Sequence, residues 1–422
     1  MKKGVKIEYK WIIAAVSFLM VFVTLGFCSS AKSIFLKRIT EALAVKRSVF
    51  SISDSCRYVT TAIVNIFFGT LIAKFGARKL IAAGFLSLII STVLYAVASK
   101  VWMFYIGGVF LGLGFSWTTT TIVGSVIGKW FKKGKGTVMG AVLAANGLGG
   151  ALSIQILSPI IEQSTFSYRK AYWLIVAILV VVGIIVVGLF RNEPKTKDDV
   201  DGQPTETKKD NGRSWAGVPF QDVLKSKHFY VAAVCVFLAG FTLQGITGVS
   251  NPLMKDAGLD PAFVDSVLSI NLLSLMAFKF LTGFAYDKFG LKTVANVCYT
   301  MAIMAMLILS LITNSATGRV LAITYAFVST MALPLETVLI PIFAMDLFGE
   351  KPYNKVLGVF ASVNMAGQAL GAPITNLCFD LANNYNLAIY ISCGFMFIAI
   401  LLMQYVFKGS KNQRKMVEAL NP

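Results

Sequence analysis

Five ionisable side chains lie inside long apolar stretches of this sequence and are its first candidates for chemistry. Three are cations, Lys32, Arg57 and Lys279, and two are acids, Asp54 and Glu336. An ionisable side chain within a membrane helix costs about 2.5 kcal/mol or more, so it usually faces a polar cavity or a partner. Cations so placed can bind a carboxylate, and an acid so placed can carry a proton. The pattern predicts a site for a small organic anion.

Lys279 is the main candidate for binding that anion. It lies about seven residues from the end of its apolar segment, which is roughly 10 Å at the rise of an α-helix. Because this is deep for an exposed charge, we expect the ammonium group to pair with a substrate carboxylate. The alternative is that the flexible lysine stem reaches along the helix and places the ammonium group at the membrane interface.

Asp54 and Arg57 have an i, i+3 spacing, which puts both on one helix face and permits an ion pair. This pair is either structural or an outer-gate contact; alternatively, Asp54 takes part in proton coupling and releases Arg57 to the anion as a cavity opens. Lys32 lies about one turn from the outer end of the first apolar segment. It can join the same cluster or extend to the surface.

Glu336 is expected near the middle of the membrane. It follows Pro334 and lies about ten residues before Asp346, which closes its apolar segment. Removal from water favours the protonated form of a carboxyl group, whereas a nearby cation favours the ionised form. Glu336 is therefore a candidate proton carrier. The alternative is a permanently paired carboxylate that braces a kink at Pro334.

Side-chain amides inside apolar segments complete the candidate binding residues: Asn146, Gln244, Asn271 and Asn364. Each can hydrogen-bond an oxygen of the substrate. Membrane helices also use such amides to bond to one another, so interhelical contact is the alternative role.

The elements that position these residues are predicted from composition. Hydrophobic residues make up 56% of the sequence and the mean hydropathy is +0.72, too apolar for a water-soluble globule. Spanning about 30 Å of hydrocarbon takes about 20 apolar residues as a helix. An all-α polytopic membrane protein of twelve spans is therefore predicted. The expected spans are 11–33, 49–73, 79–99, 102–128, 136–161, 170–190, 229–250, 262–286, 292–313, 319–346, 355–380 and 386–407.

One connection, residues 191–227, is long and polar and has the composition of a disordered linker. It separates a six-helix bundle of residues 1–190 from a second of residues 228–408, with a tail of residues 409–422. Lys and Arg concentrate in the termini, the linker and alternate loops, which predicts that both termini are cytoplasmic in a plasma membrane of the bacterial inner type. The net charge of +19 then reflects topology and contact with lipid headgroups, so nucleic acid is not an expected partner.

An internal repeat supports two related halves. The segment from Gly69 to Lys79 reads GTLIAKFGARK, and a similar segment, GFAYDKFGLK, begins 214 residues later at Gly283. In a second pair, GAVLAANG begins at Gly140 and GVFASVNM begins at Gly358. Asn146 and Asn364 occupy the same position in these two segments.

The loop motif resembles the signature of the major facilitator superfamily. The resemblance implies two pseudo-symmetric six-helix bundles that expose a central cavity alternately to each side. It assigns gating to the glycines and charges of the two loops: Gly69, Gly76, Arg78, Gly283, Asp287 and Gly290. The acid of the first copy is replaced by Ala73, whereas the second copy keeps Asp287, so the latch is expected to be asymmetric. The alternative is a structural turn with ordinary loop charges.

A narrower resemblance is to the monocarboxylate transporters and the oxalate:formate antiporters. A G-F pair at Gly26 precedes K-S-I at Lys32, and Lys279 stands four residues before Gly283, where both families have an arginine. The resemblance implies a monocarboxylate carried by proton symport or anion exchange. The proton-coupling aspartate of the first family is Leu275 here, so Glu336 is proposed as its substitute.

Other classes of protein are less consistent with the sequence. It contains no G-x-x-x-x-G-K-[ST] loop and no C-x-x-C pair, so neither an enzyme nor a cofactor or metal is expected. The expected partners are an organic anion, protons and lipid, and the protein is expected to work as a monomer. A superfamily exporter of a drug-like or larger amphipathic compound is the main alternative, and a transporter-like sensor is a further one.

Overall fold

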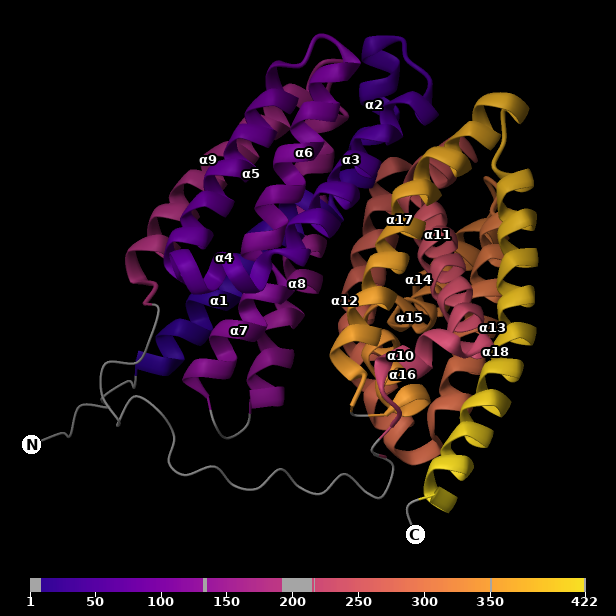
Figure 1. The fold of residues 1–422 in the computed structure, drawn as a ribbon. Helices are drawn as coiled ribbons and strands as arrows, with labels where there is room; N and C mark the ends of the chain where they lie inside the picture. Colours follow the sequence, from indigo (N-terminus) through magenta and orange to yellow (C-terminus); the bar gives the residue numbers. More distant parts are fainter. Residues whose placement is uncertain (1–8, 132–134, 192–214, 216, 350, 421–422) are drawn as a thin grey trace, which may run out of the picture. The chain divides into compact units, whose positions relative to one another are not determined.

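The structure is a computed structural model that describes residues 9–131, 135–191, 215, 217–349 and 351–420. All regular elements in these ranges are helices (Figure 1). Eleven of the described helices are long and apolar enough to cross a membrane. The prediction of an all-α polytopic membrane protein is confirmed.

The chain divides into two compact units. The first comprises Met1–Val45 and Val59–Glu206, and the second comprises Lys46–Tyr58 and Thr207–Pro422. The helix α3 (Arg47–Ile66) therefore belongs to the second unit in its first three turns and to the first unit in the remainder.

In the first unit, the helix pairs α1 with α8, α5 with α6 and α5 with α9 pack most extensively. Its elements are α1 (Tyr9–Leu25), η1 (Gly26–Ser30), α2 (Lys32–Leu43), the end of α3, α4 (Phe68–Phe75), α5 (Ala77–Val97), α6 (Val101–Thr118), α7 (Thr120–Trp130), α8 (Lys135–Ile161) and α9 (Tyr168–Leu189). The helices α1 and α8 pack closely at Gly149, which has no side chain. A Cβ at this position would lie 2.1 Å from the carbonyl oxygen of Phe22.

In the second unit, α11 packs against α17 and α18, and α14 packs against α12 and α13. Its elements are the start of α3, α10 (Phe220–Lys225), α11 (Lys227–Asp256), α12 (Pro261–Phe289), α13 (Leu291–Ser310), α14 (Ala316–Ala332), α15 (Pro334–Thr337), α16 (Leu339–Phe348), α17 (Tyr353–Ala382) and α18 (Asn386–Leu420). The helices α11 and α17 can approach closely because Gly367 has no side chain. A Cβ at this position would lie only 2.3 Å from the Phe237 carbonyl oxygen.

Two predicted spans are interrupted helices. The span predicted at 49–73 breaks at Phe67, between α3 and α4. The span predicted at 319–346 breaks at Leu333, because Pro334 lacks the N–H that would continue the helical bonding. The short helix α15, which carries Glu336, lies between the two halves of that span.

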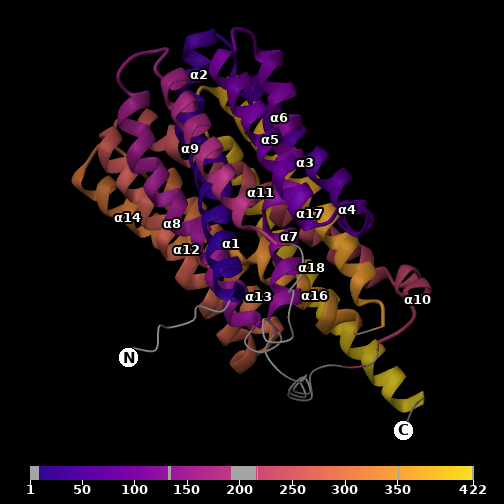
Figure 2. The ribbon, with the colours of Figure 1, turned by 90° about the vertical axis from the view of Figure 1, so that its left-hand side faces the viewer.

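Two other segments are more helical than expected. The first span does not end at residue 33, since α2 continues to Leu43, and Arg38 pairs with Glu162 there. Residues 409–420, expected as a tail, continue α18, whose last turns project from the unit in Figure 2. Ser410 holds this extension by donating to the Leu347 carbonyl at 2.9 Å.

The repeated loops adopt the same backbone conformation. Gly76 precedes α5 with φ 75° and ψ 158°, and Gly290 precedes α13 with φ 79° and ψ 166°. A positive φ is readily adopted only by glycine, which explains the residue type at both positions.

Most of the predicted linker 191–227 lies outside the described residues. Trp215 is buried and its indole N–H donates to the Asp346 carbonyl at 3.2 Å. The residues just before α10 are thereby fastened to the end of α16.

Candidate functional site

Two of the predicted functional residues lie within electrostatic range of each other inside the second unit. Lys279 on α12 and Glu336 on α15 are both half-buried and interact electrostatically. The Oε1 atom of Glu336 is buried and has no hydrogen-bond partner. The pair thus combines a cation with a carboxyl oxygen that is free to bond to another group.

Two amides of α17 lie next to this pair. Gln368 interacts with the Glu336 carboxyl group, and its Nε2 donates to Asn364 Oδ1 at 2.9 Å. Asn364 is buried, and its Nδ2 donates to the Val236 carbonyl of α11 at 3.1 Å. Asn364 was predicted to contact substrate, and both ends of its amide bond to the protein here. Gln368 was not singled out from the sequence.

The start of α3 contributes a third group of charges to the second unit. Arg57 and Asp54 form an ion pair, with Arg57 Nη2 3.4 Å from Asp54 Oδ1. The Arg57 guanidinium also lies 4.2 Å from the centre of the Tyr58 ring. Tyr58 in turn interacts electrostatically with Glu336. The predicted i, i+3 pair is therefore formed, and Tyr58 beside it lies within electrostatic range of Glu336.

The remaining predicted amides of the second unit occupy different surroundings. Asn271 donates to the Ala326 carbonyl at 3.0 Å and to Ser329 Oγ at 2.7 Å, which ties α12 to α14. Gln244 is half-buried on α11. Asn271 thus makes the interhelical contacts that were the alternative to substrate binding.

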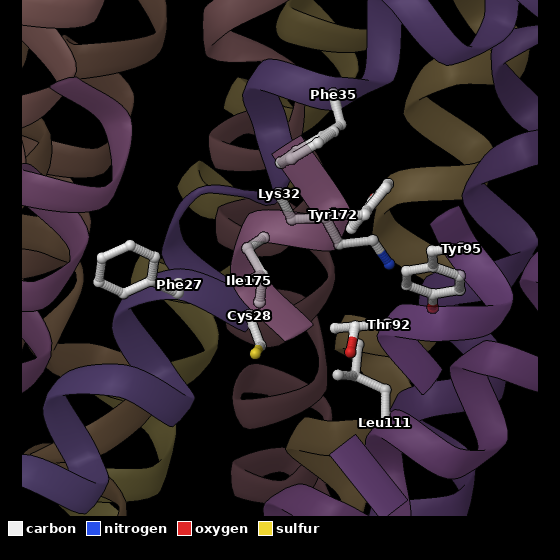
Figure 3. Close-up of a pocket in the computed structure, with 9 residues that line it drawn as sticks. All are labelled: Phe27, Cys28, Lys32, Phe35, Thr92, Tyr95, Leu111, Tyr172 and Ile175. Atoms are coloured by element: carbon white, nitrogen blue, oxygen red, sulfur yellow. The ribbon is translucent and has the colours of Figure 1, made fainter. Parts of the chain in front are cut away.

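In the first unit, Lys32 lines a small pocket with Tyr95 and Tyr172, and its amine is directed at the Tyr95 ring (Figure 3). The pocket has room for about one water molecule. Lys32 follows the π-helical turn η1, whose Ser30 donates to Asn146 Oδ1 at 3.1 Å. Asn146 and Lys32 are therefore both positioned by this turn.

Arg47, which was not a candidate site residue, makes several contacts within the second unit. Its Nη1 lies 2.6 Å from Asp256 Oδ2 and donates to the Tyr385 hydroxyl at 2.8 Å. The guanidinium also lies 4.1 Å from the centre of the Phe379 ring. Burial raises the pKa of Tyr385 to about 12, so its hydroxyl remains a donor to Asn376 at neutral pH.

The predicted gating residues lie in and beside the two repeated turns. Gly69 is in α4 and Gly283 is in α12, and Gly76 and Gly290 form the turns themselves. Arg78 donates to the Val187 carbonyl at 2.8 Å, and Asp287 is exposed at the end of α12.

Among the described residues, no three His, Cys, Asp or Glu side chains are arranged to hold a metal ion. The six cysteines form no disulfide bond: Cys28, Cys56, Cys235, Cys298, Cys378 and Cys393.

These features define a multi-pass helical membrane protein built from two units with a repeated glycine turn and with charges buried between helices. The chain belongs to the major facilitator superfamily, whose model matches residues 11–372 and 232–421. It is a transporter of that superfamily, as the repeated loop motif indicated.

The chain is similar in sequence to several transporters and in fold to solved transporter structures. The chain is 24% identical over 397 residues to the uncharacterized MFS-type transporter YcxA of Bacillus subtilis (strain 168), with 92% of each chain covered. It is 25% identical over 428 residues to human monocarboxylate transporter 2, covering 92% of this chain and 83% of that one. A crystal structure of the nucleoside transporter NupG shares the fold, with a TM-score of 0.76, 16% identity and coverage of 95% of this chain and 100% of that chain.

Proposed function

We propose that this protein is a secondary transporter of a small monocarboxylate that works by alternating access and couples the anion to a proton. The observation that carries the proposal is the Lys279–Glu336 pair, in which Oε1 of Glu336 has no hydrogen-bond partner. Lys279 binds the substrate carboxylate, and Glu336 carries the proton.

The coupling follows from the charge of the site. Ionised Lys279 and ionised Glu336 together carry no net charge, so a bound monoanion adds one uncompensated negative charge in a region of low dielectric. Such a charge is costly, and protonation of Glu336 removes it. Anion and proton therefore bind together, and the loaded site is neutral. Without a pH gradient, the same site exchanges one loaded anion for another.

The residue types favour a monoanion over a dianion. The site has one cation on α12, and the nearby position on α17 is the neutral Asn364. Lysine is a point charge that lacks the bidentate geometry of arginine, so it binds a carboxylate with less geometric selectivity. The similarity to human monocarboxylate transporter 2 supports the same class of substrate.

We further propose that the protein lies in a plasma membrane of the bacterial inner type, works as a monomer and keeps both termini in the cytoplasm. The distribution of Lys and Arg among its loops supports this orientation.

The test is transport by the purified protein in liposomes. Labelled formate, lactate and an aromatic monocarboxylate are compared with a dicarboxylate and a neutral nucleoside, with and without an imposed pH gradient. We expect saturable uptake of at least one monocarboxylate, accelerated when the liposome interior is alkaline. Transport of the neutral compound together with no transport of any carboxylate would overturn the proposal.

A further inference from the structure

The amides of Asn364 and Gln368 lie one turn apart on α17 and form a short chain that leads to Glu336. Asn364 is 3% exposed and lies against α11, where a Cβ on Gly240 would come within 2.7 Å of its Nδ2. Its side chain is therefore held by close packing as well as by hydrogen bonds.

The direction of this chain is fixed by the Val236 carbonyl. A carbonyl oxygen only accepts, so Asn364 must turn Nδ2 toward it, and the 3.1 Å contact is of that kind. Asn364 Oδ1 then faces Gln368 as an acceptor and receives Nε2 at 2.9 Å. An amide nitrogen carries two hydrogens, so Gln368 Nε2 retains one N–H for a second acceptor.

The Glu336 carboxyl group lies close enough to Gln368 to serve as that second acceptor. We infer that Gln368 is a positioning residue for proton coupling: held by Asn364, it donates an N–H to ionised Glu336 and keeps that carboxylate directed at Lys279. This inference rests on the proposed role of Glu336. It deepens that role by assigning the residue that stabilises the proton-free state.

The other charged groups around Glu336 are few in the described part of the second unit. Lys279 faces it from α12, and Tyr58 faces it from the start of α3 with Arg57 and Asp54 beside it. Three titratable groups on the other helices that pack against α15 bond elsewhere: Tyr325 of α14 with Ser250, Asp346 of α16 with Tyr286, and His228 of α11 with Gln413. Tyr299 of α13 is buried beside Cys235 and Cys298, and its hydroxyl has no hydrogen-bond partner among the described residues. Gln368 is thus the neutral donor for the proton-free acid.

The consequence concerns the release of the proton. Without the Gln368 N–H, ionised Glu336 keeps Lys279 as a partner but loses a hydrogen bond to its charged form. The proton-loaded state is then favoured to higher pH. Loss of Asn364 acts in the same direction, because Gln368 can then rotate and present its carbonyl oxygen to the carboxyl group.

The experiment measures monocarboxylate uptake and exchange as a function of pH in liposomes. For Gln368→Leu we expect the midpoint of pH-dependent uptake to rise by about one unit, the size of one hydrogen bond to a charged group. Exchange at low pH is retained. For Asn364→Ala we expect a smaller shift in the same direction.

The matched control is Gln404→Leu. Gln404 donates its Nε2 to Asn296 Oδ1 at 2.8 Å, so it forms a similar pair of amides between α18 and α13. We expect this variant to keep the wild-type midpoint. A Gln404→Leu shift equal to that of Gln368→Leu would overturn the inference, because both would then reflect loss of packing.

A double variant separates this inference from the proposed function. In a Glu336→Gln background, Gln368→Leu should cause no further change in the pH profile. If Glu336→Gln alone keeps full gradient coupling, the proposed proton carrier is wrong. If Glu336→Gln loses coupling and Gln368→Leu keeps the wild-type midpoint, only the role of Gln368 is wrong.

Discussion

Arg47 Nη1 lies 2.6 Å from Asp256 Oδ2, and this ion pair joins the first turn of α3 to the last turn of α11. The side chain of Arg47 is 12% exposed and that of Asp256 is 26% exposed, so solvent screens the pair only in part. The same guanidinium donates to Tyr385. One residue therefore fastens three segments of the second unit.

Replacement of Arg47 should destabilise this unit. We expect Arg47→Gln to lower the free energy of unfolding by about 1–3 kcal/mol, because the partly screened ion pair with Asp256 and the hydrogen bond to Tyr385 are both lost. Thermal unfolding of the detergent-solubilised protein measures the effect. Lys46→Gln removes the same charge at the adjacent exposed position and should leave the melting temperature unchanged. Equal melting temperatures for both variants would contradict the prediction.

Gly149 should not tolerate a methyl group. A Cβ there would lie 2.1 Å from the Phe22 carbonyl oxygen, so α1 and α8 would have to separate. We expect Gly149→Ala to cost about 1–3 kcal/mol or more. Gly140→Ala on the same helix is the control, since a Cβ there meets nothing within 4 Å. A thermal shift assay compares the two, and equal stability would show that the helices separate without cost.

The charge of Lys279 should be needed for substrate binding. We expect Lys279→Gln to raise the KM for a monocarboxylate at least about tenfold, because the carboxylate of the substrate loses an ionic partner in a site away from bulk water. Lys279→Arg keeps the charge and should retain much of the activity. Lys292→Gln, at an exposed position on α13, is the control for loss of one positive charge. An unchanged KM in Lys279→Gln would remove this residue from the site.

The acid of α15 should be needed for coupling but not for exchange. In Glu336→Gln, we expect uptake driven by a pH gradient to be abolished and anion exchange to continue, because glutamine carries no titratable proton. Asp222→Asn, at an exposed position on α10, is the control. Uptake by Glu336→Gln that still follows the gradient would refute the carrier role and leave a structural role at the kink.

The two copies of the loop motif should differ in their effect on gating. We expect Asp287→Asn to shift the population towards the inward-facing state, and reporter cysteines on the cytoplasmic side should then react faster. Ala73→Asp restores the acid in the first copy and should act in the opposite direction. Unchanged reactivity in Asp287→Asn would mean that the loop is only a structural turn.

The sequence was most informative where the signal is local. Apolar runs predicted the helices, and the spacing of glycines predicted a repeated turn, because a positive φ at Gly76 and Gly290 restricts the residue type. The break at Phe67 was not predicted, since hydropathy averages over a window longer than one helical turn. The break at Leu333 was expected only as a kink at Pro334, because proline marks such a position in the sequence.

Contacts between distant segments were beyond the sequence. Nothing in the residue types alone brings Gln368 to Glu336, because each of many amides in apolar segments is an equal candidate. Likewise, Arg47 looks like any loop cation until Asp256 and Tyr385 are placed beside it. The roles of Lys279, Glu336 and the other site residues remain predictions for the experiments above.

The π-helical turn η1 affects how Lys32 is matched to residues of related sequences. A π-turn contains one residue more than an α-turn, so deleting one residue between Gly26 and Ser30 would restore α-helical bonding and leave the orientation of the residues after it unchanged. The lysine, renumbered by one, would still face the pocket that Lys32 shares with Tyr95 and Tyr172. When relatives are aligned, a single gap in this segment therefore decides which residue corresponds to Lys32, even where every residue around it matches.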